Sequence, residues 1–159
     1  MIKKILVFMF CVLCLIGCTK AKDSKIENIE NAVNKILTAP NQNYNRIMKS
    51  TDINETVFLE GLNEIKKDFA GLIEEKTLNR LLSEQTLVYF FELSYKNDLK
   101  IECKSVEVKE QDNYYTFTSQ VLINNQETGV SGQVQVNDKG EITHLKFDEF
   151  SEMIKSFGK

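Results

Sequence analysis

Residues 114–124 read Tyr-Tyr-Thr-Phe-Thr-Ser-Gln-Val-Leu-Ile-Asn, and most of their apolar side chains recur at alternate positions. The alternating set is Tyr115, Phe117, Val121 and Ile123. Successive side chains of a β-strand point to opposite faces of its sheet, so this spacing predicts a strand that buries one face. One strand cannot form a core alone. The flanking sequence therefore has to supply both pairing strands and a covering layer.

Three neighbouring segments have the character of strands. Residues 99–109 carry apolar side chains at alternate positions, with a change of parity at Lys104-Ser105 that predicts a β-bulge. Residues 130–136 and 142–147 follow the quoted stretch, separated by Asn137-Asp138-Lys139-Gly140, which is a strong hairpin signal. Because short polar turns join consecutive strands, the sequence predicts a four-stranded antiparallel meander.

The sequence before the strands has helical periodicity instead. Ser24-x-x-Glu27 is typical of a capping box, and Pro40 ends the helix that follows it. The apolar face of this helix comprises Ile26, Ile29, Val33, Ile36 and Leu37. A second capping arrangement, Asp52-x-x-Glu55, precedes another apolar face. That face comprises Phe58, Leu62, Ile65, Phe69, Leu72 and Ile73.

Two further helical segments are expected. Residues 44–48 suit a short turn of helix between the two long ones. The other segment starts near Thr77 and runs without a turn signal into the apolar residues 87–93. Periodicity alone does not decide whether that run is a buried helix or a strand. The strong helix formers before it favour a helix that continues to about Lys96.

Helices followed by strands indicate an α+β domain in which the N-terminal helices cover one face of the sheet. This order resembles the cystatin-like and nuclear-transport-factor-2-like folds, whose helices pack into a curved sheet. The resemblance covers about residues 24–147 and is one of architecture. Asp148 is expected to cap a short C-terminal helix. We therefore predict a single α+β domain over residues 24–159. The apolar face of the last helix would comprise Phe150, Met153, Ile154 and Phe157.

The N-terminus has the three parts of a secretory signal peptide. Lys3 and Lys4 precede an apolar run over residues 5–16, and Gly17 stands at its exit. A transmembrane anchor is the weaker interpretation, because spanning a bilayer takes about 20 apolar residues. Leu15-Ile16-Gly17-Cys18 closely resembles the lipobox of bacterial lipoproteins.

The lipobox resemblance implies a processing route and a location. Residues 1–17 would be removed as a lipoprotein signal peptide, and Cys18 would carry a diacylglyceryl group at the start of a tether over residues 18–23. Two acyl chains anchor a protein stably, whereas one binds reversibly. The sequence therefore predicts a protein on the outer face of the cell membrane. Its abundant Lys, Asn and Ile suggest a low-GC Gram-positive bacterium, in which small cystatin-like lipoproteins also occur.

The net charge restricts the partners that the protein can bind, and the cysteine content restricts the disulfides that it can form. The net charge is −3, and loss of Lys3 and Lys4 with the leader would make it about −5. An acidic balance argues against binding to nucleic acid and against adhesion to anionic lipid. Only the acyl group would therefore hold the protein at the membrane. After cleavage, a lipidated Cys18 and Cys103 would remain, which leaves no intramolecular disulfide. Cys11 and Cys14 fall in the leader, so their C-x-x-C spacing predicts neither a redox nor a metal site.

The chain offers few residues for catalysis or metal binding. His144 is the single histidine, and strand parity places it on the face of Ile142 as a structural or surface residue. Cys103 alternates with Ile101 and is expected in the core, although a reactive thiol is the alternative. Acidic residues near helix ends suit solvated positions. They are Glu74, Glu75, Asp148, Glu149 and Glu152. We predict no cofactor, no metal and no catalytic residues.

Glycines and aromatic residues in the predicted elements have two interpretations. Gly129 and Gly132 in the third strand suit a bend or the close approach of another backbone. Two aromatic groups are expected mainly in the core, with a ligand pocket between helices and sheet as the alternative. They are Tyr89-Phe90-Phe91 with Tyr95, and Tyr114-Tyr115 with Phe117.

The sequence therefore predicts a non-catalytic, membrane-anchored lipoprotein that binds a protein or envelope partner at the cell surface. One alternative is a small-molecule-binding lipoprotein with a pocket between helices and sheet. A less favoured alternative is an enzyme of the nuclear-transport-factor-2-like fold, whose cavity would need a buried His or carboxylate. A sheet edge that pairs with a partner strand is a further alternative for binding.

Overall fold

The computed structural model describes residues 23–50 and 55–148. The lipobox with Cys18, the expected cap at Asp52 and the expected C-terminal helix lie outside these residues. Within them, five helices precede four strands, which confirms the predicted α+β order. The helices are α2 (Ser24–Ile36), α3 (Gln42–Lys49), α4 (Glu55–Asp68), α5 (Glu75–Ser83) and α6 (Tyr89–Asn97). The strands are β1 (Ile101–Glu110), β2 (Tyr115–Ile123), β3 (Gln126–Val136) and β4 (Ile142–Phe147).

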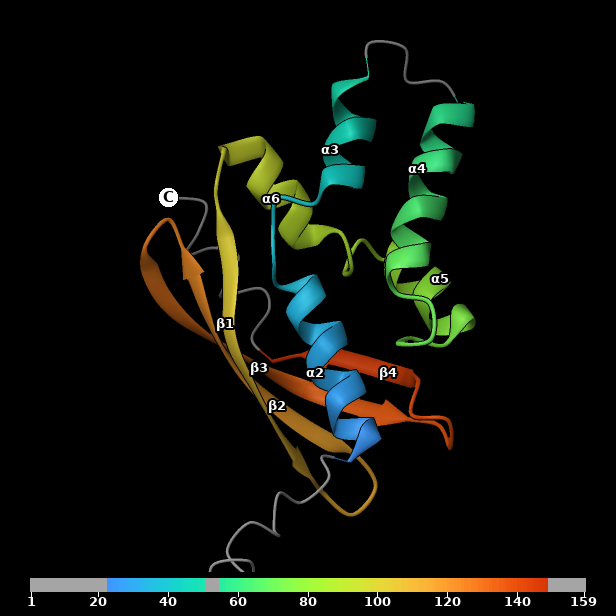
Figure 1. Cartoon of the computed structure of the whole chain (residues 1–159), viewed down its shortest axis with the longest axis vertical. Coiled ribbons are helices and arrows are strands. Elements are labelled where there is room, and N and C mark those ends of the chain that lie inside the picture. Colours follow the sequence, from blue (N-terminus) through green and yellow to red (C-terminus); the bar gives the residue numbers. More distant parts are fainter. Residues whose placement is uncertain (1–22, 51–54, 149–159) are drawn as a thin grey trace, which may run out of the picture.

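The sheet is the predicted antiparallel meander, with strand order β1-β2-β3-β4 (Figure 1). Its first pairing shifts register between Cys103 and Ser105, which confirms the expected bulge. The β2–β3 hairpin turns at Asn124 and Asn125, whose φ angles of 45° and 71° suit the twist of a two-residue hairpin. Polar Asn tolerates this left-handed conformation better than most residues.

Two irregular segments pair with the outer strands of the sheet. Ala39 forms an isolated antiparallel bridge with Ile101 in β1, and their backbones exchange two hydrogen bonds of 2.9 Å. Ile73 forms a parallel bridge with Ile142 in β4. Edge backbone groups that are satisfied in this way cannot pair with another chain. Both bridges also connect the helical layer to the sheet.

The surface position expected for His144 is confirmed, but its predicted place on the same face as Ile142 is wrong. Ile142 is fully buried, whereas His144 is exposed on the other face and pairs with Gln135. The pairing of β3 with β4 shifts register between Gln135 and Val136. A bulge adds one residue to a strand, so side chains on either side of it no longer keep the alternation that sequence parity assumes.

Helix α2 lies across the covered face of the sheet (Figure 1). Four of the five residues predicted for its apolar face are fully buried, namely Ile29, Val33, Ile36 and Leu37. The helix begins one residue earlier than the capping box suggested. Asp23 is the N-cap, and its carboxylate accepts a hydrogen bond from the N–H of Lys25 at 3.0 Å. An Asp at this position satisfies a free N–H of the first turn as well as Ser does.

The expected continuous helix over residues 77–96 is two helices. Gln85 adopts a left-handed φ of 59°, and the chain turns before α6 begins at Tyr89. The turn carries Leu87 inward until it is fully buried, and its N–H donates to the carbonyl of Leu81 at 3.2 Å. Burial of Leu87 and of α6 therefore outweighs the local preference for an unbroken helix. The run 87–93 is helical from Tyr89 onward rather than a strand.

Aromatic rings fill the space between the helices and the sheet. Phe90 and Phe91 of α6 are fully buried, and Phe117 of β2 is 1% exposed. The Phe147 ring packs against two of these three phenylalanines, with ring centroids 6.0 Å from Phe90 and 5.6 Å from Phe117. Both contacts are edge-on, which is a favoured arrangement for aromatic rings. The core interpretation is thus confirmed for Phe90, Phe91, Tyr115 and Phe117. Tyr89 and Tyr95 are only half-buried, and Tyr114 is exposed.

Helices α3 and α4 lie side by side beyond one end of the sheet (Figure 1). Gly61 allows their close contact, since a Cβ at this position would lie 2.1 Å from Cγ1 of Ile47. Within α4 only Gly61 and Ile65 are buried. Among the described residues, none of the helices has the length and apolar composition that a membrane span requires.

Asn28 connects three parts of the chain, so its loss is expected to weaken the fold. Its amide group donates to the carbonyls of Gly71 and Gly140, both at 3.0 Å, and so joins α2 to two loops. We expect Asn28→Ala to lower the free energy of unfolding by about 1–2 kcal/mol, because two hydrogen bonds are lost. Urea unfolding monitored by circular dichroism measures this change.

Asn31→Ala is the matched control, because Asn31 is exposed on the same helix. Ala is the better helix former, so this variant should be unchanged or more stable by a few tenths of a kcal/mol. Equal stability losses in the two variants would show that the bonds from Asn28 contribute nothing.

Candidate binding groove between the helices

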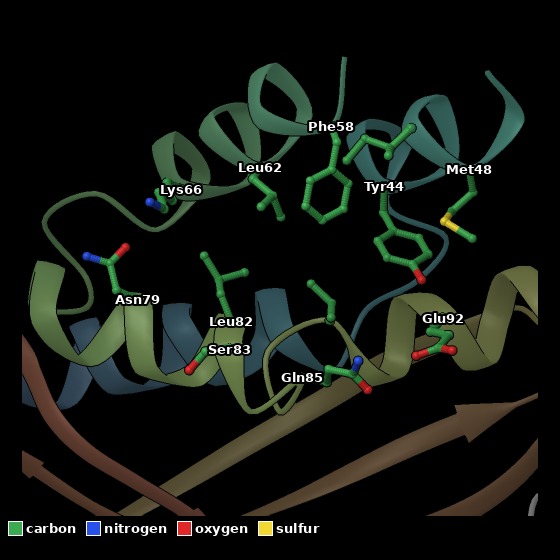
Figure 2. A pocket seen from close by; sticks show the side chains of 12 residues that line it. Tyr44, Met48, Phe58, Leu62, Lys66, Asn79, Leu82, Ser83, Gln85 and Glu92 are labelled. Carbon is green, nitrogen blue, oxygen red and sulfur yellow. The ribbon is translucent and has the colours of Figure 1, made fainter. Parts of the chain in front are cut away.

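A groove with a cavity volume of about 460 Å³ lies among helices α3, α4, α5 and α6 (Figure 2). Most of its walls are apolar, and polar groups lie at its rim. Its lining residues are Tyr44, Ile47, Met48, Phe58, Leu62, Lys66, Asn79, Leu82, Ser83, Gln85, Val88 and Glu92. A mainly apolar concavity with a few polar groups is the usual form of a binding site.

The walls of the groove come from regular helical spacing. Phe58, Leu62 and Lys66 of α4 are four residues apart, so they form one stripe along the helix. Leu82 of α5 points toward Leu62 from the opposite wall (Figure 2). The turn at Gln85 separates α5 from α6 and so shapes the lower wall. The break that the sequence did not predict is therefore part of the groove.

The two ends of the groove differ in charge. Lys66 and Asn79 lie at one end, and Met48 and Glu92 lie at the other (Figure 2). Glu92 forms an ion pair with Lys96 one helical turn further on. Lys66 forms no ion pair with another residue of the ranges 23–50 and 55–148. The Lys66 end is thus the positively charged end without an internal counter-ion in the described part of the chain.

Apolar surface continues from the groove onto the outside of α4. Phe58 is 46% exposed and Leu59 is 50% exposed, although Phe58 was predicted on a buried face. The expectation fails because α4 packs mainly against α3 and lies away from the sheet. Its apolar stripe is wider than the surface available to cover it. The consecutive apolar residues Val57, Phe58 and Leu59 indicated this in the sequence, since three neighbours cannot share one helix face.

Tyr44 lies where the groove meets the core. It is 9% exposed, and its ring packs 6.2 Å from Phe91 and 6.4 Å from Tyr95. Burial, together with smaller contributions from the nearby Glu92 and Tyr95, raises the pKa of Tyr44 to about 12. The neutral phenol is therefore the form that this site favours.

The raised pKa of Tyr44 predicts a loss of stability at high pH. The unfolded pKa is about 10, so between pH 10 and 12 the folded state holds more protons than the unfolded state. The contribution of Tyr44 to the free energy of unfolding is therefore fully present below pH 10 and is lost as the pH rises toward 12. We expect Tyr44→Phe to lose less stability than the wild type between pH 9 and pH 11.5. Urea midpoints measured across this range test the difference.

Tyr89 and Tyr115 also have raised pKa values, but they are present in both proteins. The difference between wild type and variant therefore isolates Tyr44. Parallel pH profiles for the two proteins would contradict the assignment.

The residues that the sequence singled out do not meet in this groove. Cys103 is buried with 9% exposure, its thiol donates to the carbonyl of Ser105, and burial raises the pKa of the thiol. This confirms it as a core residue. His144 is exposed on the open face of the sheet. Glu75 and Asp148 are exposed, as expected, and Glu74 is half-buried before α5. Glu149 and Glu152 lie outside the described residues.

The aromatic side chains of the groove, Tyr44 and Phe58, belong to neither of the aromatic stretches that the sequence pattern selected. Within the described ranges, no three His, Cys, Asp or Glu side chains are grouped so that they could hold a metal ion. Comparison of the chain with protein-family models, with curated proteins and with solved structures gives no significant match.

Proposed function

We propose that this chain is a non-catalytic lipoprotein that is anchored on the outer face of the cell membrane and binds a protein partner through the groove. The lipobox-like sequence ending at Cys18 supports the anchor. The order of helices and sheet supports a resemblance to the cystatin-like and nuclear-transport-factor-2-like folds. Folds of this kind serve many functions, so the groove itself carries the argument for binding.

The single observation behind the binding proposal is the continuous apolar surface of the groove and α4. The cavity is lined mainly by apolar side chains, and the adjoining Phe58 and Leu59 remain about half exposed. Exposed apolar patches with polar rims are typical of protein interaction sites. Burial of Phe and Leu in a partner would remove from water the surface that the chain itself leaves uncovered.

A small molecule held against the sheet is less well supported. The interface between α6 and the sheet is occupied by Phe90, Phe117 and Phe147, whose rings are 5% exposed or less. Space for a ligand lies instead among the helices, on the outside of this interface. A small apolar ligand in the groove remains a distinct outcome of the binding experiment below.

The anchor is tested by Cys18→Ser. A serine hydroxyl cannot accept the thioether-linked diacylglyceryl group, so two acyl chains are lost together. We expect the wild-type protein in the membrane fraction of the producing cells and the variant in the medium or in an unprocessed form. Metabolic labelling with an alkyne fatty acid should mark only the wild type. Equal membrane association with labelling of both proteins would refute the anchor at Cys18.

Binding is tested by site-specific photocrosslinking on intact cells. A diazirine amino acid replaces Leu59, the exposed neighbour of the groove residue Phe58 on α4, and a second protein carries it in place of Gln133, which is exposed on the open face of the sheet. We expect one protein adduct of defined mass at Leu59 and none at Gln133. Adducts of the same kind at both positions, or none at Leu59, would contradict a protein-binding groove.

A further inference from the structure

We infer that the partner enters the groove as an amphipathic helix of about two turns, with a carboxylate opposite Lys66. This inference rests on the proposed function and adds the conformation, length and charge of the bound segment. Three observations carry it, namely the helical walls of the groove, the spacing of its apolar residues and the charge at one end.

The walls of the groove are mainly helical, so most of their backbone groups are bonded within the helices. The walls consist of the four helices and the turn between α5 and α6. In that turn the N–H groups of Gln85 and Leu87 already donate to the carbonyls of Leu82 and Leu81. An extended segment in an apolar groove would bury its own N–H and C=O groups without partners. A helix satisfies these groups internally, so it is the form of polypeptide that this groove can accept.

The spacing of the wall residues sets the length of the bound segment. Phe58 and Lys66 are eight residues apart on α4, which corresponds to about 12 Å along a helix axis. A bound helix of two turns spans the same distance. It would place apolar side chains at positions i, i+3 or i+4, and i+7 against Phe58, Leu62 and Leu82. Met48 at the far end has a flexible side chain that can adapt to the last anchor.

The charges at the two ends give the segment a preferred register. Glu92 is already paired with Lys96, whereas Lys66 has no ion-pair partner in the described part of the chain. A carboxylate beside the apolar anchor at the end of the groove opposite Met48 would complement Lys66. Charged pairs at an interface rim contribute mainly to register and partner choice. The partner segment is therefore apolar on one face and acidic at one end of that face.

The experiment extends the crosslinking at Leu59 on intact cells. Digestion and mass spectrometry identify the crosslinked segment of the partner. The diazirine residue is then moved through that segment, one position at a time, with the groove protein unchanged. A helical segment should crosslink with a period of three to four residues, whereas an extended segment should crosslink with a period of two. A period of two would overturn the helical form of the inference.

Lys66→Glu tests the charge, with Lys67→Glu as the matched control. Lys67 is the next residue of α4, is absent from the groove lining and pairs with Glu64 instead. We expect Lys66→Glu to reduce the Leu59 adduct at least threefold and Lys67→Glu to leave it unchanged. Replacing the facing carboxylate of the partner with Lys should restore the adduct to Lys66→Glu. Equal effects of the two substitutions, or no restoration, would overturn the charge assignment.

Other outcomes separate this inference from the proposed function. A protein adduct through an extended segment, or through one without a carboxylate, contradicts the inference and leaves the protein-binding function standing. An adduct with a lipid, with another small molecule or with a second copy of this chain also overturns the inference. Absence of any adduct at Leu59 contradicts both.

Discussion

Gly132→Ala is expected to lower the free energy of unfolding by about 3 kcal/mol or more, at the upper end of what overpacking costs. A Cβ at this position would lie 2.3 Å from the backbone carbonyl oxygen of Lys146 and 2.6 Å from the ring of Phe117. The oxygen belongs to the neighbouring strand, so it cannot move without disturbing the β3–β4 pairing. Since domains are stable by about 5–15 kcal/mol, the loss is a large share of the total. Urea unfolding measures it.

Gly129→Ala is the matched control on the same strand. No heavy atom lies within 4 Å of a Cβ at Gly129. The substitution should therefore leave stability unchanged or raise it slightly, because Ala restricts the unfolded chain more than Gly does. The sequence suggested a bend or the close approach of another backbone at both glycines, and the structure shows a close approach only at Gly132. Equal losses at the two positions would show that the strand, rather than the contact with Lys146, requires Gly.

Phe90→Ala is expected to cost about 3–5 kcal/mol, the usual range for a fully buried Phe. Phe90 is fully buried, and its ring contacts Tyr89 at 5.6 Å and Phe147 at 6.0 Å. Removal of the ring leaves a cavity where α6 packs on the sheet. Because the surrounding helices and strands can close this cavity only in part, the loss exceeds the transfer free energy of the ring. Thermal and urea unfolding should both show it.

Phe58→Ala makes the same chemical change at a surface position. Phe58 is 46% exposed and lines the groove, so we expect a change of about 0.5 kcal/mol or less. The Leu59 adduct on intact cells should nevertheless fall in this variant. This pair of substitutions separates the aromatic residues that hold the fold from those proposed to bind a partner. A loss above about 2 kcal/mol at Phe58 would show that the groove is part of the core.

Local patterns predicted most of the sheet. Alternation placed β4 at residues 142–147, the bulge beside Ser105 followed from a parity change, and the hairpin at Asn137 was recognised from its turn residues. These features depend on neighbours in the sequence, so the sequence can show them. The failures came from longer-range effects. The register shift near Gln135 reversed the expected side of His144.

The groove could be predicted only in part. Periodicity placed Phe58 and Leu62 on one face of a helix. A short turn of helix was expected at residues 44–48, where the structure has α3 from Gln42 to Lys49. Periodicity could not show that α4 packs beside α3 and leaves this face partly open. Nor did it identify the break at Gln85, since Gln is not a typical residue for a left-handed turn. The lining of the groove thus combines one predicted stripe with walls that were not predicted.

The sequence by itself determined the type and order of the elements, because helix and strand periods, caps and hairpin turns act over a few neighbouring residues. It also provides the basis for the proposed anchor at Cys18. The tertiary structure decided where the helices end, which face His144 occupies and which apolar residues remain uncovered. These outcomes depend on competition between distant segments for the same core. The burial of Leu87 and Phe90 turned the chain at Gln85, and α4 was left with more apolar surface than the core could cover.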